Sequence, residues 1–290
     1  MPLGSSEFIL NADGSIYHLN LFPKDIATTI ITVGDPDRVS DVSQYFDYIE
    51  VKKSKREFVT HTGVLNKKRL TVISTGIGTD NIDIVLNELD ALVNIDFENR
   101  SIKKKKTQLD IIRIGTSGAI QPTIPIDCFL LSEYAMGFDA LLHFYDSAEI
   151  LHSKFSAAFV AHANWSTLKS VPYVVKCDDV LASQFISDQV KYGLTVTNIG
   201  FYGPQSRSLR LKISDKNLRK KLSNFRYKDL KITNLEMETS GIYGLSKLLG
   251  HRAVSLNCIL ANRVTGEFSK DPNNSVTELI KYTLKRLTIH

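Results

Sequence analysis

Two carboxylates stand two residues apart in the segment 234–239. Glu236 and Glu238 flank Met237, and in an extended chain both carboxylates project to one side while Met237 projects to the other. Such a pair is suited to acid–base chemistry or to binding vicinal hydroxyl groups. It is equally compatible with capping of a helix that starts near Thr239, because negative charge stabilises a helix N-terminus. The sequence leaves both interpretations open.

Gln205 and Arg207 have the same two-residue spacing. The amide of Gln205 both donates and accepts hydrogen bonds, and the guanidinium of Arg207 is a planar fork of donors. Together they can bind a ring that carries adjacent carbonyl and N–H groups. The same pair also occurs at ordinary protein surfaces, so its meaning depends on what lies beside it.

A glycine and an arginine near the N-terminus are suited to binding an anion. Gly34 follows an apolar run and precedes the start of a helix, where the backbone can approach a ligand closely and N–H groups favour negative charge. Arg38 lies about one helical turn further along. Its side chain can therefore reach the same anion.

Arg113 stands in an otherwise apolar run, where an unpaired charge is expensive. Its neighbours Thr116 and Ser117 add hydroxyl groups and backbone donors. Either Arg113 pairs with a buried carboxylate, for which Glu238 is available, or it binds an anion. On the second interpretation, Arg113→Ala removes anion binding and leaves the fold intact.

These candidates fall at the ends of predicted strands. Seven apolar segments are predicted as strands: Thr29–Val33, Leu70–Ser74, Asp110–Ile114, Ile126–Ser132, Thr195–Gly200, Ile232–Leu235 and Ala253–Leu260. We expect the third to be broken by the segment 115–118. A helix is predicted after Gly34, with Asp35 as N-cap and Pro36 as its first residue. Further helices are predicted over 82–93, 239–249 and 275–287.

The alternation of strands and helices predicts a single α/β domain over residues 1–290, with a central mixed β-sheet flanked by helices. In open sheets of this class, ligands bind beyond the carboxyl ends of the strands, where the candidate residues gather. Residues 1–16 are predicted as an N-terminal extension. Residues 95–107 are predicted as a basic surface loop.

The composition argues against several functional classes. The 36 Lys and Arg against 31 Asp and Glu give a formal net charge of +5, and the lysines at 103–106 account for most of that excess. A nucleic-acid-binding protein spreads its cations over a face and interleaves aromatic residues, so no nucleic-acid partner is expected. No stretch approaches the roughly 18 apolar residues of a membrane span, and the N-terminus lacks the basic start of a secretory signal. We therefore expect no membrane association.

The cysteines indicate a reducing compartment. Cys128, Cys177 and Cys258 are odd in number, lie far apart and lack the CxxC spacing of a zinc site. Each has apolar neighbours, as expected of small buried side chains. We expect a cytoplasmic protein. The sequence also lacks a complete dinucleotide fingerprint and a Walker A motif.

Taken in order, the candidate segments resemble the nucleoside phosphorylase family, in its uridine phosphorylase branch. The matching stretches are Gly34–Arg38, Arg56–Phe58, Ser74–Gly78, Arg113–Pro122, Phe201–Tyr202, Gln205–Arg207, Asn234–Glu238 and Asn262–Arg263. The resemblance runs from about Tyr17 to the C-terminus and is weakest between Asp146 and Lys191. It implies the three-layer α/β/α fold of that family. It also implies a pentosyltransferase that converts uridine and phosphate reversibly into uracil and ribose 1-phosphate, a reaction of pyrimidine salvage.

The resemblance assigns the anion to inorganic phosphate. It implies a phosphate site formed by Gly34, Arg38, Arg113 and Thr116 and completed by Arg56 of a neighbouring subunit. Three guanidiniums around one phosphate are chemically reasonable, because they stay charged and match the phosphate oxygens. A homodimer, or a hexamer built from dimers, is therefore expected.

The resemblance places the ribose on the paired carboxylates. It implies that Met237 and Glu238 hold the sugar, with Glu236 nearby, and that His18 of the neighbouring subunit reaches the 5′-hydroxyl. For the base it implies Gln205 and Arg207 on the uracil edge. It also implies Phe201 against the face of the ring, Ser117 and Gly118 in the lining of the pocket, and Arg263 in support of the base.

The implied reaction needs no covalent nucleophile. The ribose becomes oxocarbenium-like as the glycosidic bond stretches, and the base gains negative charge. Arg113, Gln205, Arg207 and Glu238 are the implied catalytic residues, because each faces charge that develops in the transition state. No cofactor is expected. A monovalent cation such as K⁺ near Glu57 occurs in some members of the family and stays open here.

Three alternatives remain. A purine or broad-specificity nucleoside phosphorylase typically has an aspartate near Asn262 to protonate the purine, and the sequence has no acid there. A nucleosidase uses water and does not need the phosphate arginines. A non-catalytic paralogue that partners an active subunit is expected to have lost site residues, whereas this sequence keeps them.

Overall fold

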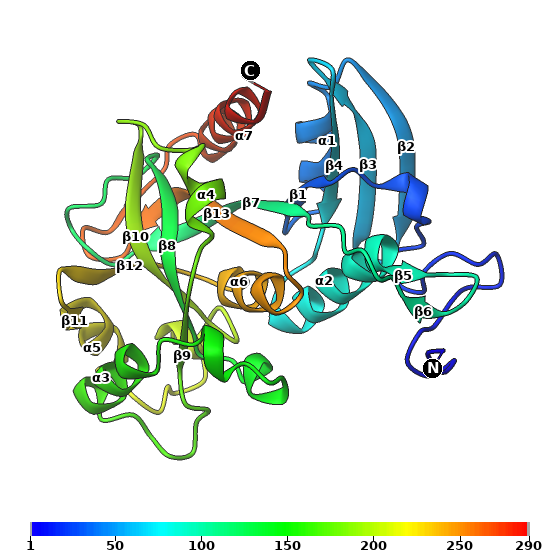
Figure 1. The fold of residues 1–290 in the computed structure, drawn as a ribbon. Helices are drawn as coiled ribbons and strands as arrows, with labels where there is room; N and C mark the ends of the chain where they lie inside the picture. The colour runs from blue at the N-terminus through cyan, green and yellow to red at the C-terminus, as the bar shows by residue number, and fades with distance from the viewer. Residues whose placement is uncertain (1, 289–290) are drawn as a thin grey trace.

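The computed structural model describes residues 2–288 (Figure 1). The strands are β1 (Thr29–Val33), β2 (Tyr48–Lys55), β3 (Phe58–Leu65), β4 (Lys68–Ser74), β5 (Ile95–Asp96), β6 (Ser101–Ile102), β7 (Asp110–Ala119), β8 (Phe129–Gly137), β9 (Tyr173–Lys176), β10 (Val190–Thr197), β11 (Arg226–Tyr227), β12 (Leu230–Glu236), β13 (Arg252–Asn262) and β14 (Glu267–Phe268). The helices are α1 (Asp37–Ser43), α2 (Thr79–Asn94), α3 (Ser153–Ala163), α4 (Asp179–Ser183), α5 (Leu218–Asn224), α6 (Thr239–Leu248) and α7 (Pro272–Thr288).

Most strands belong to one mixed sheet. Its order is β11-β12-β10-β8-β13-β7-β1-β4-β3-β2, with β9 attached to β8 and β14 to β13. β7 runs parallel to both β1 and β13, whereas β2, β3 and β4 form an antiparallel ribbon at one edge. The predicted fold class, a mixed sheet flanked by helices, is confirmed.

The sheet closes on itself through an added pairing. The end of β12 pairs antiparallel with the end of β7, through Asn234 opposite Ala119 and Leu235 opposite Gly118. The strands β7, β13, β8, β10 and β12 therefore form a closed ring, from which β1, β4, β3 and β2 extend. This closure brings the carboxyl end of β12 against the second half of β7.

The predicted break at residues 115–118 is wrong, because β7 continues to Ala119. β13 pairs with it along its length, with Gly115 opposite Asn257 and Ser117 opposite Ile259. The ladder hydrogen bonds outweigh the modest cost of glycine inside a strand. Residues 116–118 consequently lie on a rigid strand and not on a loop.

Helices cover both sides of the sheet. α2 and α6 lie side by side (Figure 1), and α7 packs on β7 and β13. Almost all of α6 is buried, as its apolar face predicts, and Gly250 with φ 79° ends it. The first predicted helix begins one residue late, at Asp37, because Pro36 lies at the cap position. The Asp35 side chain still accepts a hydrogen bond from the Asp37 N–H at 3.0 Å.

The N-terminal extension and residues 95–107 both pack onto the domain. Residues 95–107 contain the β5–β6 hairpin, so the prediction of a simple loop is only partly correct, and the lysines at 103–106 are exposed. Arg100 in this segment donates hydrogen bonds to the carbonyl oxygens of Leu3, Gly4 and Phe8. The Phe8 side chain is buried in the main core. In the part of the chain that the structure describes, no helix has both the length and the apolar character needed to cross a bilayer.

Tyr243 in α6 connects two strands of the ring. Its hydroxyl donates to the Ser132 carbonyl oxygen at 2.6 Å and accepts from the Ser255 N–H at 2.8 Å. We expect Tyr243→Phe to lower the free energy of unfolding by about 1–3 kcal/mol, because two buried backbone groups lose their partner. Urea denaturation measures this, with the exposed Tyr48→Phe as control. Equal midpoints for the two variants would contradict the assignment.

Candidate active site

A cavity of about 880 Å³ opens at the carboxyl ends of β1, β4, β7, β12 and β13. Twelve of the residues predicted from the sequence line it: Gly34, Arg38, Arg113, Thr116, Ser117, Gly118, Phe201, Gln205, Arg207, Glu236, Met237 and Glu238. His18, Arg56 and Arg263 are not among the lining residues. The sequence therefore predicted about half of the lining residues.

Arg113 is buried and paired with both carboxylates. Its Nη2 lies 2.6 Å from Oε2 of Glu238 and 3.2 Å from Oε2 of Glu236. Its Nη1 donates to Oδ1 of Asn257 at 2.9 Å. Burial by itself lowers the pKa of Arg113, but the two carboxylates outweigh burial and raise the pKa above its usual range. The guanidinium is permanently charged.

Glu238 is held from two sides. Its Oε1 accepts a hydrogen bond from the Gly78 N–H at 2.9 Å, and its Oε2 accepts from Arg113. Burial raises the pKa of Glu238, the charge of Arg113 opposes that shift, and the neighbouring Glu236 reinforces it. Both oxygens have fixed positions in the cavity wall.

Glu236 caps α6, which was one of the two interpretations that the sequence left open. Its Oε2 accepts the backbone N–H groups of Glu238 and Thr239, both at 2.9 Å. Its Oε1 accepts from the Thr197 hydroxyl at 2.6 Å. With these bonds and the Arg113 contact, Glu236 orients the site and has little capacity left for a further donor.

Because Arg113 is paired with two carboxylates, Arg113→Ala is no longer expected to leave the fold intact. That variant leaves two buried carboxylates without their cation, which typically costs about 3–5 kcal/mol. Arg113 is thus paired with buried carboxylates, which confirms the first interpretation. It also lines the cavity, and its binding of an anion stays a prediction. Loss of function in Arg113→Ala would not separate binding from folding.

Arg38 is a cation of the cavity wall that has no partner in the described part of the chain. Within residues 2–288 its guanidinium forms no hydrogen bond and no ion pair. Burial lowers its pKa, and repulsion from Arg113 lowers the pKa further. A neighbouring negative charge would oppose both effects. Arg38 and Arg113 therefore give one end of the cavity a concentrated positive charge.

Gln205 and Arg207, predicted from the sequence to act together on a ring, both line the cavity and are bonded to each other. Arg207 Nη1 donates to Oε1 of Gln205 at 2.5 Å and to the Phe201 carbonyl oxygen at 2.9 Å. The guanidinium also stacks on the Phe201 ring, 3.8 Å from its centroid. An aromatic face, an amide and a guanidinium therefore meet at one place in the wall. This combination suits a flat ring with a polar edge.

Arg263 supports this wall from outside the cavity. It donates hydrogen bonds to the backbone carbonyl oxygens of Gln205 and Ser206. Burial, with repulsion from Arg207 and Arg219, lowers the pKa of Arg263 to about 10. The structure thus places Arg263 against the backbone of residues 205–206 and not in the cavity lining.

Neither His18 nor Arg56 lines the cavity, although Glu57, next to Arg56, does. His18 Nδ1 is 2.6 Å from Oε1 of Glu88 in α2, and Arg56 occupies the turn between β2 and β3 with φ 55°. Lys55 joins the two segments, because its Nζ donates to the Tyr17 carbonyl oxygen at 2.5 Å. The two side chains are therefore carried by connected segments.

Part of the lining was not predicted from the sequence. Asn81 lies in the first turn of α2, Phe268 at the end of β14, Ser269 just after it, and Pro272 at the start of α7. These residues carry no motif, since ordinary polar and apolar types at a helix start and in a loop resemble surface residues.

The three thiols take no part in this site. Burial raises the pKa of Cys128 to about 11 and the pKa values of Cys177 and Cys258 to about 12. None of the three lines the cavity. Their prediction as small buried side chains holds for Cys177 and Cys258, while Cys128 is half-buried.

Comparisons with known proteins agree with this geometry. A family model described as "Phosphorylase superfamily" matches residues 28–287. The uridine phosphorylase of Thermococcus kodakarensis is 28% identical over 266 residues, which cover 92% of this chain and 84% of that protein. The uridine phosphorylase of Haemophilus influenzae is 28% identical over 270 residues, covering 91% and 92%. A Trypanosoma brucei nucleoside phosphorylase, whose structure is described as showing uridine phosphorylase activity, superposes with a TM-score of 0.87 at 28% identity, covering 97% of this chain and 99% of that one.

Gly115 is required by the position of Arg113. A Cβ at Gly115 would lie 1.9 Å from Arg113 Nη1, so Gly115→Ala must displace the guanidinium from its carboxylates. We expect the free energy of unfolding to fall by about 3–5 kcal/mol, as for other broken buried ion pairs. Gly118→Ala in the same strand is the control, since its Cβ meets neighbours only at 3.8 Å or more. Urea denaturation of both variants measures the difference, and an unaltered midpoint for Gly115→Ala would refute it.

Proposed function

The chain belongs to the phosphorylase superfamily, and from this membership we propose that it catalyses the reversible phosphorolysis of uridine to uracil and ribose 1-phosphate. One observation carries the proposal. The same cavity contains an anion-binding end at Arg38 and Arg113 and a ring-binding wall at Gln205 and Arg207, with the Glu238 carboxylate in its lining. These are the three recognition elements that phosphate, a base and a ribose require.

Phosphate fits the two guanidiniums. Arg38 has no partner among the described residues, and its repulsion from Arg113 falls when a phosphate dianion lies between them. Gly34 and Thr116 also line this end and add backbone and hydroxyl donors. A nucleosidase, which uses water, has no need of two convergent guanidiniums. The arginines therefore favour phosphorolysis over hydrolysis.

The ribose fits the fixed carboxylate of Glu238. With Oε1 held by Gly78 and Oε2 by Arg113, the carboxylate can accept further hydrogen bonds from sugar hydroxyls without moving. Met237 lines the same wall and offers an apolar contact to the sugar ring. Binding of the hydroxyls at fixed oxygens aligns C1′ for attack.

The reaction forms one bond and breaks one. A phosphate oxygen attacks C1′, and the bond from C1′ to the pyrimidine nitrogen breaks with its electron pair on the base. The ribose passes through an oxocarbenium-like state, which the phosphate anion stabilises, while Gln205 and Arg207 stabilise the uracil anion until it takes a proton from water. The protein supplies positioning and charge, so no cysteine nucleophile is needed.

The structure around Asn262 favours a pyrimidine base over a purine. Its Nδ2 donates to the carbonyl oxygens of Gln121 and Ile124, and its Oδ1 accepts from the Val264 N–H. Asn262 therefore stabilises a turn and offers no proton to a purine. The Gln205 and Arg207 pair matches the carbonyl and N–H edge of uracil instead.

We propose that a second copy of the chain completes each site. His18 and Arg56 lie outside the cavity of their own subunit and are joined through Lys55, which suits delivery of both side chains to a neighbour. A homodimer satisfies this arrangement, and so does a hexamer built from such dimers.

Phosphate is the only co-substrate we propose. A monovalent cation such as K⁺ beside Glu57, which lines the cavity, is a further proposed ligand. The three unpaired thiols support a cytoplasmic location.

Substrate choice tests the proposal directly. We expect uridine with phosphate to yield uracil and ribose 1-phosphate, and we expect no release of uracil when phosphate is omitted. Inosine is expected to react at least about 100-fold more slowly, because its purine leaves the polar groups of the wall unpaired. Chromatography of the free bases, with deoxyuridine and thymidine included, measures the series. Rapid cleavage of inosine without cleavage of uridine would overturn the pyrimidine assignment.

Arg38→Ala tests the phosphate end without the cost of Arg113→Ala. Because Arg38 has no protein partner in the described residues, we expect an unchanged unfolding midpoint. The KM for phosphate should rise about 10- to 100-fold, corresponding to one lost hydrogen bond between charged groups. Steady-state kinetics at varied phosphate and fixed uridine measure the effect, with Lys104→Ala as a control on the exposed lysine run. An unchanged KM would remove Arg38 from the site.

A further inference from the structure

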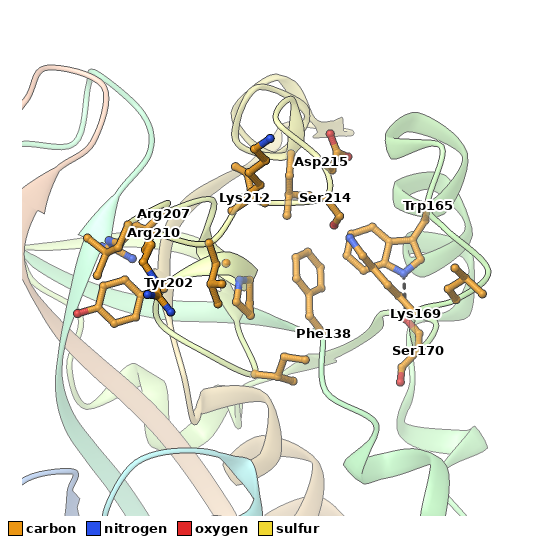
Figure 2. A pocket seen from close by; sticks show the side chains of 18 residues that line it. Phe138, Trp165, Lys169, Ser170, Tyr202, Arg207, Arg210, Lys212, Ser214 and Asp215 are labelled. Carbon is orange, nitrogen blue, oxygen red and sulfur yellow. Dashed lines mark hydrogen bonds between the residues drawn. The ribbon is translucent and has the colours of Figure 1, made fainter.

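A second cavity of about 880 Å³ lies behind the segment 201–207. Figure 2 shows Arg207, Arg210 and Tyr202 on one side of it and Trp165 with Lys169 on the other, with Phe138 between them. The wall comes from the loop after α3 and the loop before α5. Except for Arg207, the residues that line it take no part in the proposed reaction.

The apolar part of this wall is unusually exposed. Leu168 is 96% exposed, and Leu209 and Leu211 are each 78% exposed. Ile199 and Tyr202 add exposed apolar surface at the same cavity, and Phe138 packs against Trp165 with ring centroids 4.6 Å apart. A contiguous apolar surface of this kind marks a binding site. Its occupant must contribute an apolar body.

The charges around the cavity are mostly positive. Lys169, Arg207, Arg210 and Lys212 line it, and the single acidic side chain, Asp215, is already paired with Lys221 at 2.8 Å. Within residues 2–288, neither Arg210 nor Lys212 has an ion-pair partner. Lys169 Nζ lies 4.8 Å above the Trp165 ring. The occupant must therefore also carry an anion.

Arg207 connects this cavity to the candidate active site. It lines both cavities, while Phe201 and Gln205 face the first and Tyr202 faces the second. The Phe201 and Tyr202 rings meet edge to face at 5.3 Å, and Arg207 donates to Gln205 Oε1 at 2.5 Å. Arg207 is therefore a side chain through which an anion in the second cavity can act on the wall of the first.

We propose that the second cavity binds an amphipathic anion, with an aromatic or aliphatic body and one carboxylate, sulfonate or phosphate group, and that this ligand weakens uridine binding through Arg207. The body packs on Phe138, Trp165 and the exposed leucines, and the anion pairs with Arg210 and Lys212. The binding part of this inference is independent of the proposed function. The effect on uridine rests on it.

Trp165 provides a specific measurement, because it is the only tryptophan in the sequence. The probe is 8-anilinonaphthalene-1-sulfonate, an aromatic sulfonate that fluoresces in apolar surroundings. We expect saturable probe fluorescence and quenching of Trp165 with the same dissociation constant. The double variant Arg210→Glu, Lys212→Glu should bind the probe at least roughly tenfold more weakly, since it reverses two cations. The control is Lys104→Glu, Lys105→Glu, which makes the same charge change in the exposed lysine run.

Kinetics with uridine separate the two parts of the proposal. The probe should raise the KM for uridine in the unsubstituted protein and in the control variant, and should do so much less in the Arg210 and Lys212 variant. Saturable quenching without any change in KM would overturn the coupling through Arg207. Equal probe affinity in both double variants would overturn the site, as would absence of Trp165 quenching.

Sedimentation velocity distinguishes a different occupant. If the Arg210 and Lys212 variant dissociates an assembly that the control variant keeps, the cavity is an interface between copies of the chain and the ligand proposal fails. If uridine is not cleaved at all but the probe still quenches Trp165 in a manner that depends on Arg210 and Lys212, the proposed function fails and the binding site stands.

Discussion

The buried ion cluster of Arg113, Glu236 and Glu238 is the interaction on which the rest of the site depends. One guanidinium faces two carboxylates, so the side chains alone leave a net negative charge in a buried place. Two helix N-termini offset it. The first backbone groups of α2 donate to Glu238 through Gly78, and those of α6 donate to Glu236 through Thr239. Helices packed side by side therefore stabilise the carboxylates that orient the arginine.

This cluster exists because the sheet closes. Arg113 and Glu238 are 125 residues apart in sequence, and the antiparallel pairing of β12 with β7 brings them together. Closure also explains why β7 stays regular through its glycines, since a partner strand lies on each side of it near Ala119. Gly115 serves a second purpose there, because only a residue without a side chain leaves room for the guanidinium. Strand pairing thus keeps β7 extended, and the Arg113 guanidinium requires a glycine at position 115 of the same strand.

Much of the secondary structure could be predicted from the sequence. β1 and α6 match their predicted ranges to within a residue, because each has a clear apolar pattern and a turn residue at its end. The β2–β3 hairpin, α3 and α5 were not predicted. Every second residue of β2 is exposed and the strand holds few apolar residues, so its pairing depends on β3 and not on its own pattern. The lining residues Phe268, Ser269 and Pro272 were not predicted for a similar reason. No local pattern marks them, and they reach the cavity only because of the path that the chain takes after β13.

The sequence by itself determined which chemistries were available: two carboxylates at a two-residue spacing, an amide beside a guanidinium, and arginines after apolar runs. Those properties are local, because they belong to side chains and their neighbours. Only the tertiary structure decided how the groups are used. It made Glu236 a helix cap and left Glu238 facing the cavity, and it paired Arg113 while leaving Arg38 without a partner in the described chain. It also placed Arg263 behind the wall. The reason is physical. The apolar run around Arg113 indicates that its charge needs a partner, but which polar groups meet is set by long-range strand pairing, which no local pattern encodes.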